Sequence, residues 1–149
     1  MHTPVLIAFG SNIEPERHLV RGLTRLFEVT GWQAVSTVYR TTALATPDQP
    51  DSVKNPDFLN GAIAIHQPWD PLELQRTLKA IEQEMGRQPD APRWAPRPLD
   101  LDIALMGELV RHSPNLVLPD PDMLTRPFLA VSLAQLAPAW LHPLENRPL

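Results

Sequence analysis

The order of two hydrophobic periods along the chain is the strongest constraint on its fold. Short apolar runs and alternating apolar residues are typical of strands, whereas apolar residues that recur every three to four positions are typical of helices. The six patterned segments read, in order, as strand, helix, strand, strand, helix and strand, over residues 4–9, 15–31, 32–39, 58–66, 70–86 and 99–106. This order is that of the split βαβ unit. It predicts an α+β, ferredoxin-like βαββαβ core with an antiparallel sheet.

Local signals define where the predicted helices begin and end. Pro15 suits the first position of a helix, and Gly31 suits its end. Asp70 has the place of an N-cap for the second helix, which Gly86 ends. We expect both helices on one face of the sheet. Residues 127–136 have a third helical pattern, and we expect this helix on the other face.

Prolines divide the chain into regular segments and long constrained loops. The eighteen prolines cluster at 47–56, 89–98 and 114–127, and such clusters indicate loops of restricted conformation. A length of 149 residues with 43% apolar residues suits one domain with one core. We detect no internal repeat and no linker, and therefore expect a single domain over residues 1–149.

Composition excludes several classes of site. The chain contains no cysteine, so a metal would be held by oxygen or imidazole ligands, which favours a hard cation such as Mg²⁺. The net charge of −4 argues against general nucleic-acid binding. The apolar run at 5–9 is too short for a signal segment or a membrane span. We expect a cytoplasmic monomer that acts on a small molecule and does not bind a membrane.

Asp100 and Asp102 form the sharpest candidate site. Residues two apart on a strand point to the same face, so the two carboxylates lie together, roughly 7 Å apart, while Leu101 and Ile103 point inward. Like charges at this distance repel, and a divalent cation removes the repulsion while leaving positions for phosphate oxygens. Arg97 adds a cation of the kind that stabilises a transferring phosphoryl group. The alternative is that one aspartate caps a loop and the other is only solvated.

Two further features favour a ligand. Phe58 and Asn60 share one face of the predicted strand, and an asparagine amide can both donate to and accept from the edge of a flat heteroaromatic ring. An exposed polar residue on a sheet edge would explain Asn60 as well. Glu82 lies near the C-terminal end of its helix, where the helix dipole disfavours a carboxylate, and this indicates a ligand or an arginine partner.

At this point the chain resembles one family, the 6-hydroxymethyl-7,8-dihydropterin pyrophosphokinases. The most specific part of the resemblance is residues 93–103, with the sequence Arg-Trp-Ala-Pro-Arg-Pro-Leu-Asp-Leu-Asp-Ile. Supporting segments run in order along nearly the whole chain, at residues 9–12, 39–41, 48–50, 58–60, 82 and 86–87.

The resemblance implies transfer of pyrophosphate from ATP to the hydroxymethyl group of the pterin, leaving AMP, in folate biosynthesis. It implies two Mg²⁺ ions on Asp100 and Asp102, with phosphate charge neutralised by three arginines, Arg87, Arg97 and Arg126. The residues that it implies for the nucleotide are Glu82, Arg93, Trp94, Arg97 and Ile103. Those that it implies for the pterin are Gly10, Thr41, Thr42, Leu44, Phe58, Asn60 and Phe128.

Three departures from the family pattern leave alternatives open. Pro89 stands where relatives often carry an arginine, Asp120-Pro121 replaces a histidine-tyrosine pair, and residues 52–56 are inserted. An aspartate cannot donate to phosphate and repels it. The chain could therefore act on a different pterin, or bind a pterin with little transfer. A bare ferredoxin-like RNA-binding domain is disfavoured, because the chain is acidic and lacks a basic aromatic sheet motif.

Overall fold

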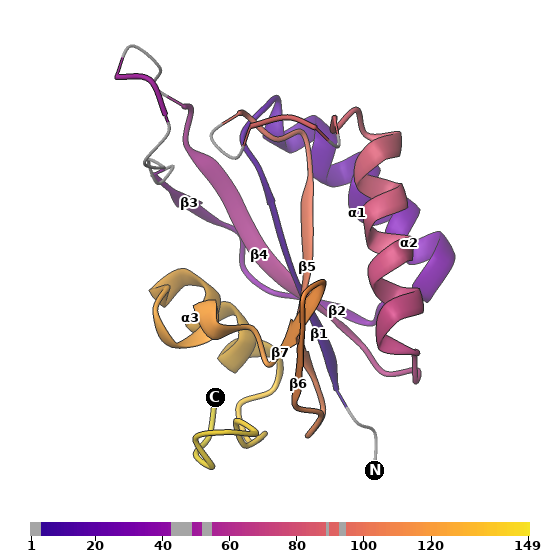
Figure 1. Cartoon of the computed structure of the whole chain (residues 1–149), viewed down its shortest axis with the longest axis vertical. Helices are drawn as coiled ribbons and strands as arrows, with labels where there is room; N and C mark the ends of the chain where they lie inside the picture. Colours follow the sequence, from indigo (N-terminus) through magenta and orange to yellow (C-terminus); the bar gives the residue numbers. More distant parts are fainter. Residues whose placement is uncertain (1–3, 43–48, 52–54, 89, 93–94) are drawn as a thin grey trace.

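The computed structural model describes residues 4–42, 49–51, 55–88, 90–92 and 95–149. Its centre is a sheet of five strands, namely β1 (Val5–Ser11), β2 (Ala34–Val35), β3 (Tyr39–Thr41), β4 (Phe58–Ile65) and β5 (Asp100–Met106). Helices α1 (Pro15–Thr30) and α2 (Pro71–Glu84) cover one face, and α3 (Pro127–Leu136) lies on the other (Figure 1). The predicted α+β architecture with helices on both faces is confirmed.

The sheet has the strand order of the ferredoxin-like core. The order is β2-β4-β1-β5, with β3 also paired to β4. Strand β1 lies at the centre and pairs antiparallel with both β4 and β5. The N-cap prediction for α2 is confirmed as well, because the Asp70 carboxylate accepts a hydrogen bond from the Glu73 N–H at 3.0 Å.

The prediction of one strand over residues 32–39 is wrong in one respect. The segment forms two short strands, β2 and β3. Between the pairs Val35–Ile63 and Tyr39–Asn60, residues 36–38 lie opposite only residues 61–62 of β4, and this mismatch interrupts the pairing. The hydroxyl of Ser36 accepts from the Ala62 N–H at 2.9 Å, so a side chain takes over part of the ladder there. Such a bulge adds a local bend.

Other boundaries also differ from the prediction. Strand β1 continues through Gly10 and Ser11, which the sequence indicates as a turn, because both residues stay paired with β4. Beyond the predicted segments, strands β6 (Arg111–Ser113) and β7 (Leu116–Leu118) pair as a two-stranded antiparallel sheet. A short 3-10 helix, η1 (Pro121–Leu124), precedes α3.

Two apolar clusters hold the layers together, one on each face of the sheet. The cluster under α1 and α2 includes Leu26, Leu78 and Leu101, and the cluster under α3 includes Leu105 and Leu133. Burial of each such leucine stabilises the fold by about 2 kcal/mol. No helix in the described part of the chain is long and apolar enough to cross a membrane.

Candidate active site

The sheet register places the candidate pterin and metal residues on one face. Gly10 of β1 pairs with Asn60 on one side and with Asp100 on the other, and Ala8 pairs in the same way with Ala62 and Asp102. Cross-strand neighbours point to the same face, which here is the face that carries α3. Two strand spacings separate Asn60 from Asp100, about 10 Å. The small residues of β1 form the floor between them.

Gly10 is required by this close approach. A Cβ atom at this position would lie 2.6 Å from the Oδ1 atom of Asn60 and 3.5 Å from the ring of Phe58. The amide of Asn60 in turn donates from Nδ2 to the hydroxyl of Thr41. The candidate pterin residues Gly10, Thr41, Phe58 and Asn60 thus lie together, and their role in pterin binding stays a prediction.

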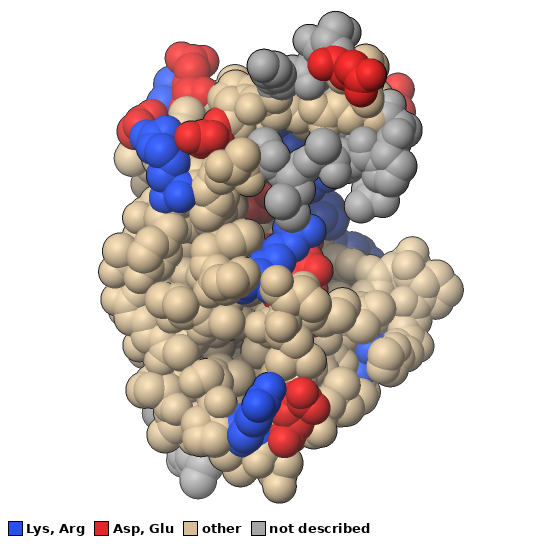
Figure 2. Space-filling model, turned by 90° about the vertical axis from the view of Figure 1, so that its left-hand side faces the viewer, with Lys and Arg blue, Asp and Glu red and all other residues tan. Residues whose placement is uncertain are grey.

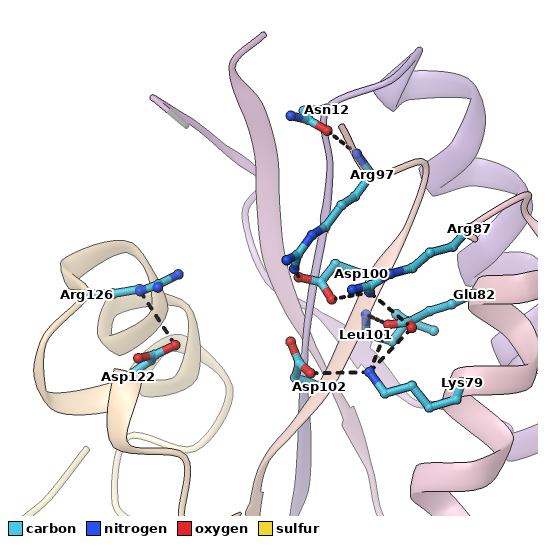
Figure 3. Close-up of polar contacts among 10 residues, drawn as sticks. All are labelled: Asn12, Lys79, Glu82, Arg87, Arg97, Asp100, Leu101, Asp102, Asp122 and Arg126. Carbon is cyan, nitrogen blue, oxygen red and sulfur yellow. Dashed lines mark hydrogen bonds and ion pairs between the residues drawn. The ribbon is translucent and has the colours of Figure 1, made fainter. Parts of the chain in front are cut away.

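Two arginines converge on Asp100. Arg87 donates to Oδ1 of Asp100 at 2.9 Å, and Arg97 donates to Oδ2 at 2.9 Å (Figure 3). The main chain of Arg97 is held on both sides by the buried Asn12, whose Oδ1 accepts from the Arg97 N–H at 2.6 Å and whose N–H donates to the Arg97 carbonyl at 3.0 Å. Asn12 therefore positions Arg97. In the sequence it was visible only as the last residue of the supporting segment 9–12.

Glu82 connects α2 to β5, the strand at the edge of the sheet. Its side chain is 2% exposed, and its Oε2 atom accepts from the Leu101 N–H of the edge strand β5 at 2.7 Å. Its Oε1 atom lies 3.1 Å from Arg87 and 3.3 Å from Lys79. The prediction of an arginine partner is confirmed. The predicted contact with a nucleotide remains a prediction, since these contacts are all with the protein.

Lys79 is a site residue that the sequence patterns did not single out. It extends from α2 between two carboxylates, with Nζ 3.3 Å from Glu82 and 3.8 Å from Asp102 (Figure 3). Lys79 and Asp102 side chains are 43% and 50% exposed, so both face open space. The only sequence signal was a scarce lysine one turn before Glu82 on the same helix.

The two aspartates are electrostatically unequal. Burial alone would raise the pKa of Asp100, but Arg97 and Arg87 outweigh it and hold that pKa below its ordinary value. Desolvation in the site and repulsion from Asp100 raise the pKa of Asp102 to about 7, against the opposing effect of Lys79. Desolvation likewise raises the pKa of Glu82. The site therefore brings three carboxylates together with three cations, and the two arginines favour the ionised form of Asp100 over that of Asp102.

A cavity of about 310 Å³ opens beside Asp102, between α2 and the β6-β7 hairpin. Its walls include Lys79, Ile103, Leu116 and Asp120, and the nucleotide role of Ile103 stays a prediction. The carboxylate of Asp120 accepts from the Asp122 N–H at 2.9 Å and caps η1. Figure 2 shows acidic and basic side chains together in a hollow of the surface.

The residues predicted from the C-terminal third lie apart from this charged cluster. Arg126, the N-cap residue of α3, pairs with Asp122 at 3.5 Å and lies across from Asp100 and Asp102 in Figure 3. Phe128 packs at the margin of the apolar cluster under α3. Helix α3 packs against β4, the strand of Phe58 and Asn60.

Several predictions fall on other parts of the chain. Thr42 directly follows β3 and is exposed. The site predictions for Leu44, Arg93 and Trp94 lie outside the described residues, as do Pro89 and part of the inserted segment 52–56.

The donor set of the two aspartates fits magnesium. Mg²⁺ is held in proteins by one or two carboxylates, with waters and substrate phosphates as its remaining ligands. Asp102 is half exposed, and desolvation together with repulsion from Asp100 raises its pKa, so a cation bound there would relieve that repulsion. Within the described residues no third acidic or histidine side chain joins them as a potential ligand. Asp100 would need to release one arginine contact to accept a metal.

A solved structure shares the fold. The chain superposes on a crystal structure of an HPPK-DHPS in complex with substrates, with a TM-score of 0.65 at 13% identity. The match covers 95% of this chain and 41% of that one, so the chain spans about two fifths of the solved protein. At this identity the likeness shows the fold alone.

Sequence comparison shows the family. A relative from Pseudomonas aeruginosa, a 2-amino-4-hydroxy-6-hydroxymethyldihydropteridine pyrophosphokinase, is 40% identical over 137 residues, which cover 90% of this chain and 80% of the relative. A protein of the same name from Synechocystis is 34% identical over 145 residues, covering 95% and 70% of the two chains. The family model for 7,8-dihydro-6-hydroxymethylpterin-pyrophosphokinase matches residues 6–138. The chain belongs to this family of pyrophosphokinases.

Proposed function

We propose that this protein transfers the pyrophosphoryl group of ATP to the hydroxymethyl oxygen of 6-hydroxymethyl-7,8-dihydropterin, in folate biosynthesis. The observation that carries the proposal is the row Asn60, Gly10 and Asp100 across three neighbouring strands. In this row the hydrogen-bonding amide of Asn60 lies about 10 Å from the charged group of Asp100, and Gly10 between them has no side chain. A pterin ring with a short hydroxymethyl arm spans this separation.

The pterin side of the site recognises a planar ring. Asn60 offers an amide edge whose orientation is held by Thr41, and Phe58 offers an aromatic face beside it. Phe128 would stack on the ring from the α3 side. These groups orient the ring so that its hydroxymethyl arm points toward Asp100.

The nucleotide side neutralises and orients phosphate. Arg87 and Arg97 present planar guanidinium groups that suit phosphate oxygens, and Arg126 approaches from the opposite wall. The cavity beside Asp102 adjoins these groups and would admit the nucleotide, and Ile103 and Leu116 line it together with Lys79 and Asp120. Arg93 and Trp94 remain predicted nucleotide residues on the same loop as Arg97.

Asp100 and Asp102 would hold the two Mg²⁺ ions. When bound, the metal supplies positive charge that stabilises the oxygens of the reacting phosphates. In the reaction, a bond forms between the hydroxymethyl oxygen and the β-phosphorus of ATP. The bond from that phosphorus to the oxygen shared with the α-phosphate breaks, AMP leaves, and the hydroxyl proton is released.

The test is AMP release from ATP and Mg²⁺, with and without 6-hydroxymethyl-7,8-dihydropterin. We expect AMP to form in step with the pterin diphosphate, and Asp100→Ala and Asp102→Ala to lower turnover at least a hundredfold, or about 3 kcal/mol. Glu16→Gln, an exposed carboxylate on α1, is the matched control.

Each outcome separates the proposal from its alternatives. Pterin binding without AMP would contradict transfer and favour a pterin-binding module, and AMP formation with another pterin only would favour a paralogue. Near-normal turnover of either aspartate variant would overturn the metal assignment.

A further inference from the structure

Lys79 occupies the position in the site where charge is least balanced. Arg87 and Arg97 both contact Asp100, whereas Lys79 approaches Asp102, with 3.8 Å between Nζ and Oδ1. Among the described residues no other cation has an ion pair with Asp102. Among the described residues, Lys79 thus supplies the cation nearest to Asp102, a carboxylate on which Asp100, Glu82 and Asp120 act as like charges.

The same lysine lines the cavity of about 310 Å³ beside Asp102. Two carboxylates, those of Asp102 and Asp120, also line this cavity, and Lys79 is the one lysine or arginine among the described residues of its wall. An anionic nucleotide that enters here meets two acidic groups and a single cation. Without that cation the cavity would repel phosphate.

Metal binding would act on Lys79, which donates to Glu82 at 3.3 Å and lies 3.8 Å from Asp102. A divalent ion on Asp102 carries twice the charge of the ammonium group and would repel it at the present distance. The lysine side chain is 43% exposed and has four rotatable bonds, so it can turn into the adjacent cavity without disturbing the core. Glu82, which is buried, stays fixed by the Leu101 N–H.

We propose that Lys79 is a positioning residue with two states. In the free protein it neutralises Asp102 in place of the metal, and when the metal binds it is displaced toward the phosphates of the nucleotide in the cavity. This inference rests on the proposed function for the identity of the nucleotide. It would couple the two ligands, because the metal releases the cation that the nucleotide needs.

The test measures metal and nucleotide binding separately, without turnover. Mn²⁺ titrated into the nucleotide-free protein is followed by the EPR signal of the free ion, and binding of α,β-methylene-ATP with Mg²⁺ is followed by calorimetry. We expect Lys79→Gln to bind Mn²⁺ about fivefold more tightly and the ATP analogue about fivefold more weakly. A change of this size corresponds to the loss of one ion pair whose side chains are half exposed. A purely structural role would move both affinities in the same direction.

Two controls complete the experiment. Lys79→Arg keeps the charge and should restore both affinities to within about twofold, and Arg76→Gln removes an exposed cation of the same helix and should change neither. Unchanged or weaker Mn²⁺ binding by Lys79→Gln, or unchanged binding of the analogue, would overturn the inference. Absence of pterin-dependent AMP in the unmodified protein would contradict the proposed function and leave the Mn²⁺ result standing.

Discussion

Gly10 decides how close the two halves of the site can lie. Its neighbours in the sheet are Asn60 and Asp100, and a Cβ atom would come within 2.6 Å of the Asn60 amide oxygen. The main chain of Asn60 is held by the ladder and its side chain by Thr41, so any shift costs a hydrogen bond. The absence of a side chain at position 10 therefore serves the orientation of Asn60.

Gly10→Ala should weaken pterin binding about tenfold, the effect of one misaligned hydrogen bond to a buried amide. Overpacking should also lower the free energy of unfolding by about 1–3 kcal/mol. A fluorescence titration with the pterin measures the first effect. Binding of α,β-methylene-ATP serves as the internal control and should stay within about twofold, since the added methyl group faces Asn60. Pterin affinity equal to that of the unmodified protein would contradict this role of Gly10.

At the scale of elements, α2 and β5 are joined by one buried carboxylate. Glu82 accepts from the main chain of the edge strand and faces two cations, so it satisfies an edge N–H and positions Lys79 and Arg87 together. The unfavourable place of this residue at the end of its helix is thereby explained by tertiary contacts.

Glu82→Ala should lower the free energy of unfolding by about 3 kcal/mol, because it leaves the buried Leu101 N–H without its acceptor and removes one of the carboxylate partners of Lys79 and of Arg87. Glu82→Gln should lose less, since its amide oxygen can still accept from Leu101. Chemical denaturation measures both. Glu84→Ala, on the same helix, removes only the exposed pair with Arg25 and should cost less than about 1 kcal/mol. Equal losses for the Glu82→Ala and Glu84→Ala variants would disprove the role of Glu82.

For the molecule as a whole, the charge of the site links stability to pH. The pKa of Asp102 is raised from 3.8 to about 7 in the folded protein, so the folded state holds a proton that the unfolded state releases between these values. The stabilising contribution of this proton is complete below pH 3.8 and is lost as the pH rises through about 7.

Without metal, the free energy of unfolding should therefore fall between about pH 4 and 7 through this group, and Asp102→Asn should flatten the decline. Mg²⁺ should restore stability most strongly above pH 7, where Asp102 is ionised and can bind it. Urea unfolding at several pH values, with and without Mg²⁺, measures this. Glu16→Gln should follow the unmodified protein. A decline that Asp102→Asn leaves unchanged would contradict the assignment.

Much of the architecture could be predicted from local patterns. The helix limits at Pro15, Gly31 and Asp70 follow from residues whose preferred backbone geometry or side-chain acceptor is itself local. The common face of Asp100 and Asp102 follows from the period of a strand in the same way. These features depend on neighbours within a few positions.

Contacts between distant segments decided the rest. The bulge that separates β2 from β3 depends on the pairing of Ser36 with Ala62, and no residue pattern within the segment predicts it. Neither the support of Arg97 by Asn12 nor the approach of Lys79 to Asp102 can be read from spacing, since these pairs are 85 and 23 positions apart. The sequence by itself determined the order of the core helices and strands, the common face of Asp100 and Asp102, and the family. Only the tertiary structure decided which charges meet, because that depends on the register of strands that are distant in the chain.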